Sequence, residues 1–100
     1  MGKTAENLHD RFPELTKERS DAFAVGSQQK LAAAYEAGHI QPDLVPVATR
    51  HVEKGWGLAT VDEPPRPGTT MEELAGLRTP FRPHGKVTAG NAAGLNDGAT

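Results

Sequence analysis

Cysteine is absent from all 100 residues of the sequence, so the chain by itself forms no disulfide, no zinc–thiolate site and no thiol nucleophile. It also lacks an apolar run of roughly 18 residues, the length that a membrane-spanning helix needs. The formal net charge is only −2, and without a basic surface nucleic acid is not an expected partner. Because no signal-peptide pattern is present either, we expect a cytoplasmic protein.

Large apolar side chains are scarce as well. Leucine, isoleucine, valine and phenylalanine together account for 18 of the 100 residues, below the roughly 20% of an ordinary globular core. The chain is long enough for one small domain at most. We therefore expect a foldable segment with a thin core that packs against the surface of a partner.

Helical patterns dominate the first part of the chain. A first helix is predicted over residues 4–12 and ends before Pro13, which cannot continue it. A long second helix is predicted over residues 17–37, with Thr16 in front of it and Gly38 as its stop. Its apolar face is expected to carry residues that recur every four positions: Phe23, Ser27, Leu31 and Tyr35.

The second part of the chain alternates between extended and helical signals. Strands are predicted over residues 44–51, 58–61 and 86–89, where β-branched residues gather between turn signals. A short helix is predicted over residues 70–77, because its first residues, TMEE, form a capping box. Together these elements predict an α+β fold with one long helix, short helices and a few short strands.

Glycines mark positions where backbones are expected to come close together. The chain ends on VTAGNAAGLNDGAT, in which Gly90, Gly94 and Gly98 are spaced by four. By spacing alone this end is either a turn or a close packing site. Gly26 inside the long helix costs about 1 kcal/mol relative to alanine, a cost often accepted where another backbone packs close.

Catalytic and metal-binding motifs fail on their spacing. The four histidines do not stand in ligand-like pairs, so a metal site is not expected. Lys86 after Gly85 is followed by valine rather than serine or threonine, which excludes a P-loop. Arg66 lies between two prolines, and a guanidinium on stiff backbone suits a phosphate group, the alternative being an ordinary solvated arginine. The residues alone thus indicate an α+β segment that contacts an anionic small molecule.

Several stretches, read together, resemble the thiolase family. The opening MGKTAEN is similar to the family's MGxTAEN, and the long helix, LTKERSDAFAVGSQQKLAAAYEAG, is similar to a helical segment of the family. The end, VTAGNAAGLNDGA, is similar to VTAGNASGxNDGA, and DEPPRPGTTMEELAGLRTPF falls between them at the usual spacing. The resemblance extends over essentially the whole chain.

The resemblance implies transfer of an acyl group to or from coenzyme A (CoA), by cleavage of a 3-ketoacyl-CoA or by the reverse condensation. In the family the reaction depends on two cysteines, a histidine and an asparagine-held water, and none of their positions matches a residue here. The resemblance therefore implies no catalytic residue, no metal and no cofactor other than CoA as substrate. Residues 1–100 are expected to be part of a thiolase N-terminal domain, mostly the loop domain that covers CoA, and to be inactive alone.

The resemblance also carries individual residues over to CoA binding. Arg66 matches an arginine near the adenine-nucleotide end, and Ala89 matches a residue that lines the groove. Ala93 stands where many members have a serine that contacts pantetheine, so that hydroxyl is missing here. Glu73 falls near CoA in some members but suits a helix cap better, and Met1 matches a methionine of the acyl pocket.

The expected partners are acyl-CoA or CoA, the remainder of a thiolase subunit and, in the complete enzyme, further copies of that subunit. Two alternatives stay open at this point. The chain is either a non-catalytic module that binds CoA or another partner without help, or a segment with a role in assembly.

Overall fold

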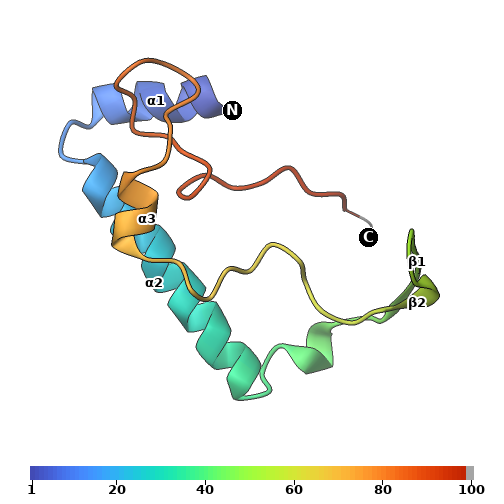
Figure 1. The fold of residues 1–100 in the computed structure, drawn as a ribbon. Helices are drawn as coiled ribbons and strands as arrows, with labels where there is room; N and C mark the ends of the chain where they lie inside the picture. The colour runs from blue at the N-terminus through green and yellow to red at the C-terminus, as the bar shows by residue number, and fades with distance from the viewer. Residues whose placement is uncertain (99–100) are drawn as a thin grey trace. The chain divides into compact units, whose positions relative to one another are not determined.

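The computed structural model describes residues 1–98, which form two compact units. One unit combines residues 1–27 with residues 68–98, and the other comprises residues 28–67. The elements, in chain order, are α1 (Gly2–Arg11), α2 (Lys17–Glu36), the 3-10 helix η1 (Gln41–Asp43), β1 (Val47–His51), β2 (Gly55–Ala59) and α3 (Met71–Ala75), as Figure 1 shows. Helices and a two-stranded sheet are consistent with the predicted α+β class.

The two predicted N-terminal helices are present, with ends close to those expected. α1 begins at Gly2 rather than at residue 4, and the Phe12 N–H closes it by donating to the Leu8 carbonyl at 2.9 Å. Thr16 accepts the Arg19 N–H at 3.2 Å, as expected of a residue in front of a helix. Gly38 has φ +76°, the left-handed conformation that ends helices, so its predicted role is confirmed.

The predicted apolar face of α2 is only partly buried in the described chain, where Leu31 and Tyr35 are half-buried. Phe23 is 80% exposed and Ser27 is exposed, while the buried residue of this helix is the carboxylate Asp21. Apolar periodicity does not predict the burial of Asp21, because its partner Asn91 lies far along the chain. The close contact expected at Gly26 is wrong, since no atom of the described residues lies within 4 Å of the position that a Cβ would take.

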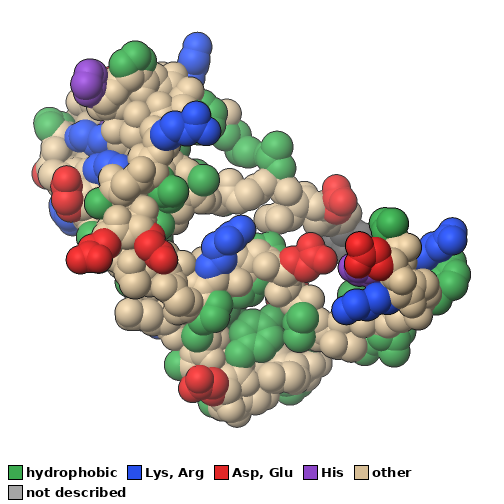
Figure 2. All heavy atoms as spheres, in the orientation of Figure 1, with side chains coloured by type: hydrophobic (Ala, Val, Ile, Leu, Met, Phe, Trp, Pro, Cys, Tyr) green, Lys and Arg blue, Asp and Glu red, His purple; other side chains and the backbone are tan. Residues whose placement is uncertain are grey.

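β1 and β2 form an antiparallel hairpin, in which β2 covers Gly55–Ala59 rather than the predicted residues 58–61. Its register pairs Val47 with Ala59 and His51 with Gly55. β1 begins at Val47 rather than at the predicted residue 44, because Leu44 caps η1 by donating its N–H to the Gln41 carbonyl at 3.2 Å and Pro46 stands just before the strand. Every residue of both strands is exposed, including Trp56 at 76%. Hydrophobic side chains accordingly appear on the surface of the hairpin, at the right of Figure 2.

The capping box at the start of α3 is confirmed. The Thr70 hydroxyl accepts the Glu73 N–H at 3.3 Å, and the Glu73 carboxylate accepts the Thr70 N–H at 3.2 Å. α3 ends at Ala75, slightly earlier than predicted. Glu73 therefore has the structural role that a residue at the third helical position of a capping box is expected to have.

The strand predicted over residues 86–89 is wrong, because this segment is irregular. Its backbone N–H groups are taken up by side chains of α1 and of Asn91 rather than by a neighbouring strand. The core of the first unit lies at this segment. Its buried residues, polar and apolar, are Glu6, Asp21, Leu74, Val87 and Thr88.

Candidate functional site

The candidate site is built on residues 86–91, which we call the 86–91 loop. In Figure 1 the segment after α3 passes beside α1. Glu6 of α1 holds the start of the loop there. One Glu6 carboxylate oxygen accepts the Lys86 N–H at 2.9 Å and the Val87 N–H at 2.8 Å, and the other accepts Lys86 at 3.1 Å. Glu6 is only 1% exposed, so this carboxylate takes the place of a neighbouring strand.

Arg82 completes the attachment of this segment to α1. Its guanidinium lies 3.3 Å from a Glu6 carboxylate oxygen and donates to the Glu6 carbonyl at 2.9 Å. It also forms a two-pronged pair with Asp10, in which both N–O distances are 2.8 Å. Such forked pairs fix orientation as well as charge. Arg82 therefore sets how the chain enters the 86–91 loop.

Neighbouring N–H groups and the Arg82 guanidinium compensate the charges of Glu6 and Asp10 and lower the pKa of each carboxyl. Burial alone would raise the pKa of Glu6, but the N–H groups of Val87 and Lys86 and the Arg82 guanidinium together hold it below the ordinary 4.5. The hydrogen bond from Arg82 likewise lowers the pKa of Asp10 below 3.8. Both carboxylates are thus ionised at neutral pH and act as fixed acceptors.

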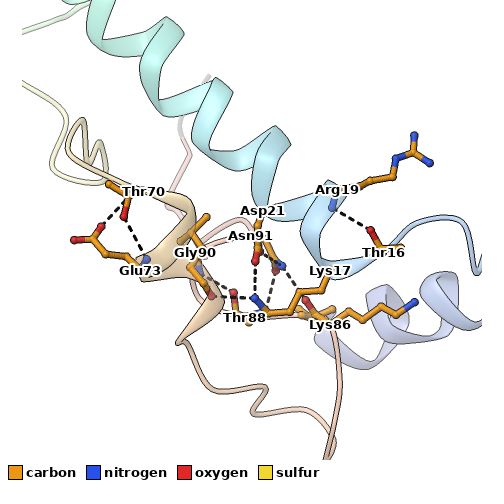
Figure 3. Close-up of polar contacts among 12 residues, drawn as sticks. Thr16, Lys17, Arg19, Asp21, Thr70, Glu73, Lys86, Thr88, Gly90 and Asn91 are labelled. Carbon is orange, nitrogen blue, oxygen red and sulfur yellow. Dashed lines mark hydrogen bonds and ion pairs between the residues drawn. The ribbon is translucent and has the colours of Figure 1, made fainter.

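The other end of the loop is held by Asn91 and α2, as Figure 3 shows. The Asn91 amide donates to Asp21 at 2.9 Å and to the Lys86 carbonyl at 2.8 Å, while its oxygen accepts the Thr88 N–H at 2.8 Å. Lys17 pairs with Asp21 and also donates to the Leu74 carbonyl at 2.9 Å. A chain of polar contacts thus joins α2, α3 and the loop.

Close packing against leucine side chains explains why residue 90 is a glycine. A Cβ at this position would lie 2.2 Å from a Leu74 methyl and 2.9 Å from a Leu77 methyl, far inside van der Waals contact. Gly94 is different, since the nearest atom to its Cβ position is 3.7 Å away, and nothing among the described residues lies within 4 Å of that at Gly98. Within residues 1–98, close approach is required at Gly90 alone of these three.

Four of the five residues that the family resemblance assigns to CoA binding lie in the first unit. Ala89 is exposed at the surface of the 86–91 loop, directly after buried Thr88, and Ala93 is exposed a few residues further on. Met1 is 84% exposed, and Glu73 is occupied by its capping box. The structure therefore places Ala89 on a fixed loop.

The fifth residue, Arg66, belongs to the second unit. It is exposed, and its backbone N–H donates to the Gln28 side-chain oxygen at 2.8 Å. The prolines on either side of it line a hollow of about 250 Å³ together with residues of α2 that include Gln28, Ala32 and Tyr35. Arg66 thus stands at a small, mostly apolar hollow.

A hydrogen bond of Tyr35 also holds the walls of this hollow together. Its hydroxyl donates to the Asp62 carboxylate at 2.9 Å. Burial, and then this hydrogen bond, raise the pKa of Tyr35 above 10, so the phenol keeps its proton and stays a donor at neutral pH. The end of α2 and the proline-rich loop are thereby tied together within the unit.

Residues 1–98 contain neither a candidate metal site nor a candidate membrane-spanning helix. No group of three or more histidine, aspartate or glutamate side chains in residues 1–98 is arranged to hold a metal ion. In the same part of the chain, no helix has the length and apolar character needed to cross a membrane.

Sequence reasoning missed the residues that build the site. Glu6, Asp21 and Asn91 all lie in stretches that resemble the thiolase family, yet composition rules treat charged side chains on helices as solvated. Their burial depends on partners far along the chain, such as Lys86 for Glu6. A sequence signal was available for Asn91 alone, as a polar residue among the small residues of TAGNAAG.

Comparison with known proteins assigns the class. The family described as "Thiolase, N-terminal domain" matches residues 1–100, and the chain belongs to this family. It is 51% identical over 100 residues to an acetyl-CoA acetyltransferase of Pseudomonas aeruginosa, covering 99% of this chain and 25% of that protein. It is 43% identical over 99 residues to the mitochondrial 3-ketoacyl-CoA thiolase of Rattus norvegicus, covering 99% of this chain and 24% of the relative.

Solved structures agree with this assignment. The acetyl-CoA acetyltransferase of Bacillus anthracis matches with a TM-score of 0.87 and 42% identity over 97% of this chain and 24% of that one. The human mitochondrial 3-ketoacyl-CoA thiolase matches with a TM-score of 0.81 and 39% identity, covering 92% of this chain and 23% of that structure. The chain therefore has the fold of part of a thiolase and spans about a quarter of the length of these relatives.

Proposed function

We propose that this chain is the CoA-covering loop domain of a thiolase subunit, which cleaves 3-ketoacyl-CoA with CoA or condenses acyl-CoA molecules. The observation that carries the proposal is the family match over residues 1–100, in which the fixed 86–91 loop coincides with the stretch VTAGN. Relatives named acetyl-CoA acetyltransferase and 3-ketoacyl-CoA thiolase support the acyl-CoA chemistry. The cysteines and histidine of the reaction then come from the remainder of the subunit.

The proposed contacts follow the physical character of each residue. Ala89 and Ala93 are exposed and small, so the pantetheine arm passes close to their backbone. Arg66 pairs with phosphate at the nucleotide end, and the apolar hollow beside it takes part of the adenine. Met1 faces the acyl end. Glu73 is committed to its cap, and its carboxylate repels CoA phosphates, so it lies near CoA without binding it.

Calorimetric titration of the chain with CoA tests this proposal. We expect no binding or binding weaker than roughly 10 μM, because the rest of the CoA groove lies in the remainder of the subunit. Replacement of Arg66 by alanine weakens this binding further, whereas the same change at exposed Arg78 leaves it unaltered. Incubation with acetoacetyl-CoA and CoA yields no acetyl-CoA. Turnover above background contradicts the proposal, whereas an absence of CoA binding agrees with a segment that needs the remainder of its subunit.

An independent CoA-binding module is the second candidate, and the hollow beside Arg66 favours it. Binding tighter than roughly 10 μM, worth about 7 kcal/mol, is the result that this candidate predicts. The two candidates therefore make opposite predictions for one titration.

We also propose that the complete enzyme is a homo-oligomer located in the cytoplasm. The fully exposed hairpin, with Trp56 at 76% and Val52 at 97% exposure, supports association, since isolated two-stranded hairpins are marginally stable in water. Sedimentation that shows only monomer at tens of micromolar chain counts against an association surface in this segment.

A further inference from the structure

Asn91 uses its whole side-chain amide within the protein. Its nitrogen donates both to Asp21 of α2 and to the Lys86 carbonyl, and its oxygen accepts the Thr88 N–H. Its own backbone N–H donates to the Thr88 carbonyl at 3.3 Å. These bonds tie the last residue of the 86–91 loop to its first and third residues. The loop is therefore closed on itself by one side chain.

Asp21 orients that amide. The Asp21 side chain is 2% exposed and holds two partners, Asn91 through one oxygen and Lys17 through the other, as Figure 3 shows. Because Lys17 also donates to the Leu74 carbonyl, Asp21 is linked through Lys17 to α3. An ionised carboxylate only accepts hydrogen bonds, so the Asn91 amide has to turn its nitrogen toward Asp21.

Ala89 is the one exposed residue of the 86–91 loop. Thr88 is 1% exposed, and its hydroxyl accepts the Gly90 N–H at 3.2 Å, while Ala89 between them is exposed. The position of Ala89 is thus set by bonds that its neighbours make. A misplacement of about 1 Å at a ligand wall is enough to lose much of the benefit of orientation.

We propose that Asn91, oriented by Asp21, is a positioning residue that holds Ala89 against the amide-containing pantetheine arm of the acyl carrier. Asn91 touches no substrate in this account and acts through the shape of the 86–91 loop. The inference rests on the proposed function, because it takes CoA as the ligand of the loop.

The test compares two isosteric changes on the full chain labelled with ¹⁵N. In Asn91→Asp the side chain keeps its shape but loses both donated bonds and places a negative charge beside Asp21. Asn96→Asp is the matched control, because Asn96 is exposed and adds the same charge near the same end of the chain. Amide spectra with and without millimolar CoA report both the loop and the ligand.

We expect Asn91→Asp to shift the amide signals of residues 86–90 and to weaken CoA binding at least tenfold. Asn96→Asp is expected to change the affinity by less than twofold. The double change Asp21→Asn with Asn91→Asp restores a donor and an acceptor across this contact and recovers part of the affinity. Where Asn91→Asp alone does not fold, Asp21→Asn replaces it, with a smaller expected loss.

The outcomes separate this inference from the proposed function. If CoA shifts the Ala89 signal equally in the unchanged chain and in Asn91→Asp, with equal affinity, the positioning role is overturned and the proposed function stands. If CoA leaves residues 86–93 unaltered in the unchanged chain, the inference is overturned, while the proposed function is tested separately by its activity in a complete enzyme. A chain without dispersed amide signals for the loop also overturns the inference, because the bonds of Asn91 then do not fix it.

Discussion

Replacement of Gly90 by alanine gives the sharpest test of how the 86–91 loop is packed. The added Cβ would lie 2.2 Å from a Leu74 methyl and 2.9 Å from a Leu77 methyl, so either side chain or the loop has to move. Leu74 is only 3% exposed and has little room to do so. Overpacking of this kind costs about 1–3 kcal/mol, and we expect the free energy of unfolding to fall by that amount.

Gly94→Ala is the matched control for this change. Its nearest neighbour, a side-chain oxygen of Asn96, is 3.7 Å from the new Cβ, an ordinary contact. Urea unfolding followed by circular dichroism measures both variants, and a loss of 1 kcal/mol corresponds to about 4–8 °C in melting temperature for a chain of this size. Equal stability of Gly90→Ala and Gly94→Ala would refute the packing described for Gly90.

The remaining predictions concern charge, capping and backbone strain. Because the pKa of Glu6 is lowered, its contribution to stability is present above its ordinary pKa of 4.5 and is lost as pH falls through its folded value. Glu6→Gln is expected to remove this loss of stability at acid pH. A variant whose free energy of unfolding depends on pH as in the unchanged chain contradicts the role given to Glu6. Thr70→Ala removes the cap of α3 and costs about 1 kcal/mol, which amide exchange in α3 detects; unaltered exchange refutes it. His84 has φ +53°, a left-handed conformation that glycine adopts with less strain than other residues. We therefore expect His84→Gly to raise the free energy of unfolding in urea by about 0.5–1 kcal/mol and His84→Ala to give no gain. A lower stability with glycine would contradict backbone strain at this position.

Local features of the fold were predictable from the sequence. The capping box at Thr70, the stop at Gly38 and the hairpin around residues 51–55 each depend on neighbouring residues and on backbone conformations that few side chains adopt. Such signals do not require knowledge of the rest of the chain. They were confirmed to within a few residues at the ends of each element.

The site was less predictable because its contacts are distant in sequence. The strand predicted over residues 86–89 has the composition of a strand, yet Glu6 and Asn91 take up the backbone groups that a neighbouring strand would have used. The apolar pattern pointed to a face on which Phe23 is 80% exposed, although Leu31 and Tyr35 of the same face are half-buried. The small residue Ala89 was identified from resemblance alone, whereas the polar residues that hold its loop needed the structure.

The most direct test of the central claim is the activity of a hybrid enzyme. In it, residues 1–100 of this chain replace the matched quarter of the acetyl-CoA acetyltransferase of Pseudomonas aeruginosa, to which they are 51% identical. If the chain is a CoA cover, the hybrid cleaves acetoacetyl-CoA with CoA, and Arg66→Ala in it raises the KM for CoA more than it lowers kcat. A hybrid that folds and assembles like its parent but shows no cleavage would contradict the account.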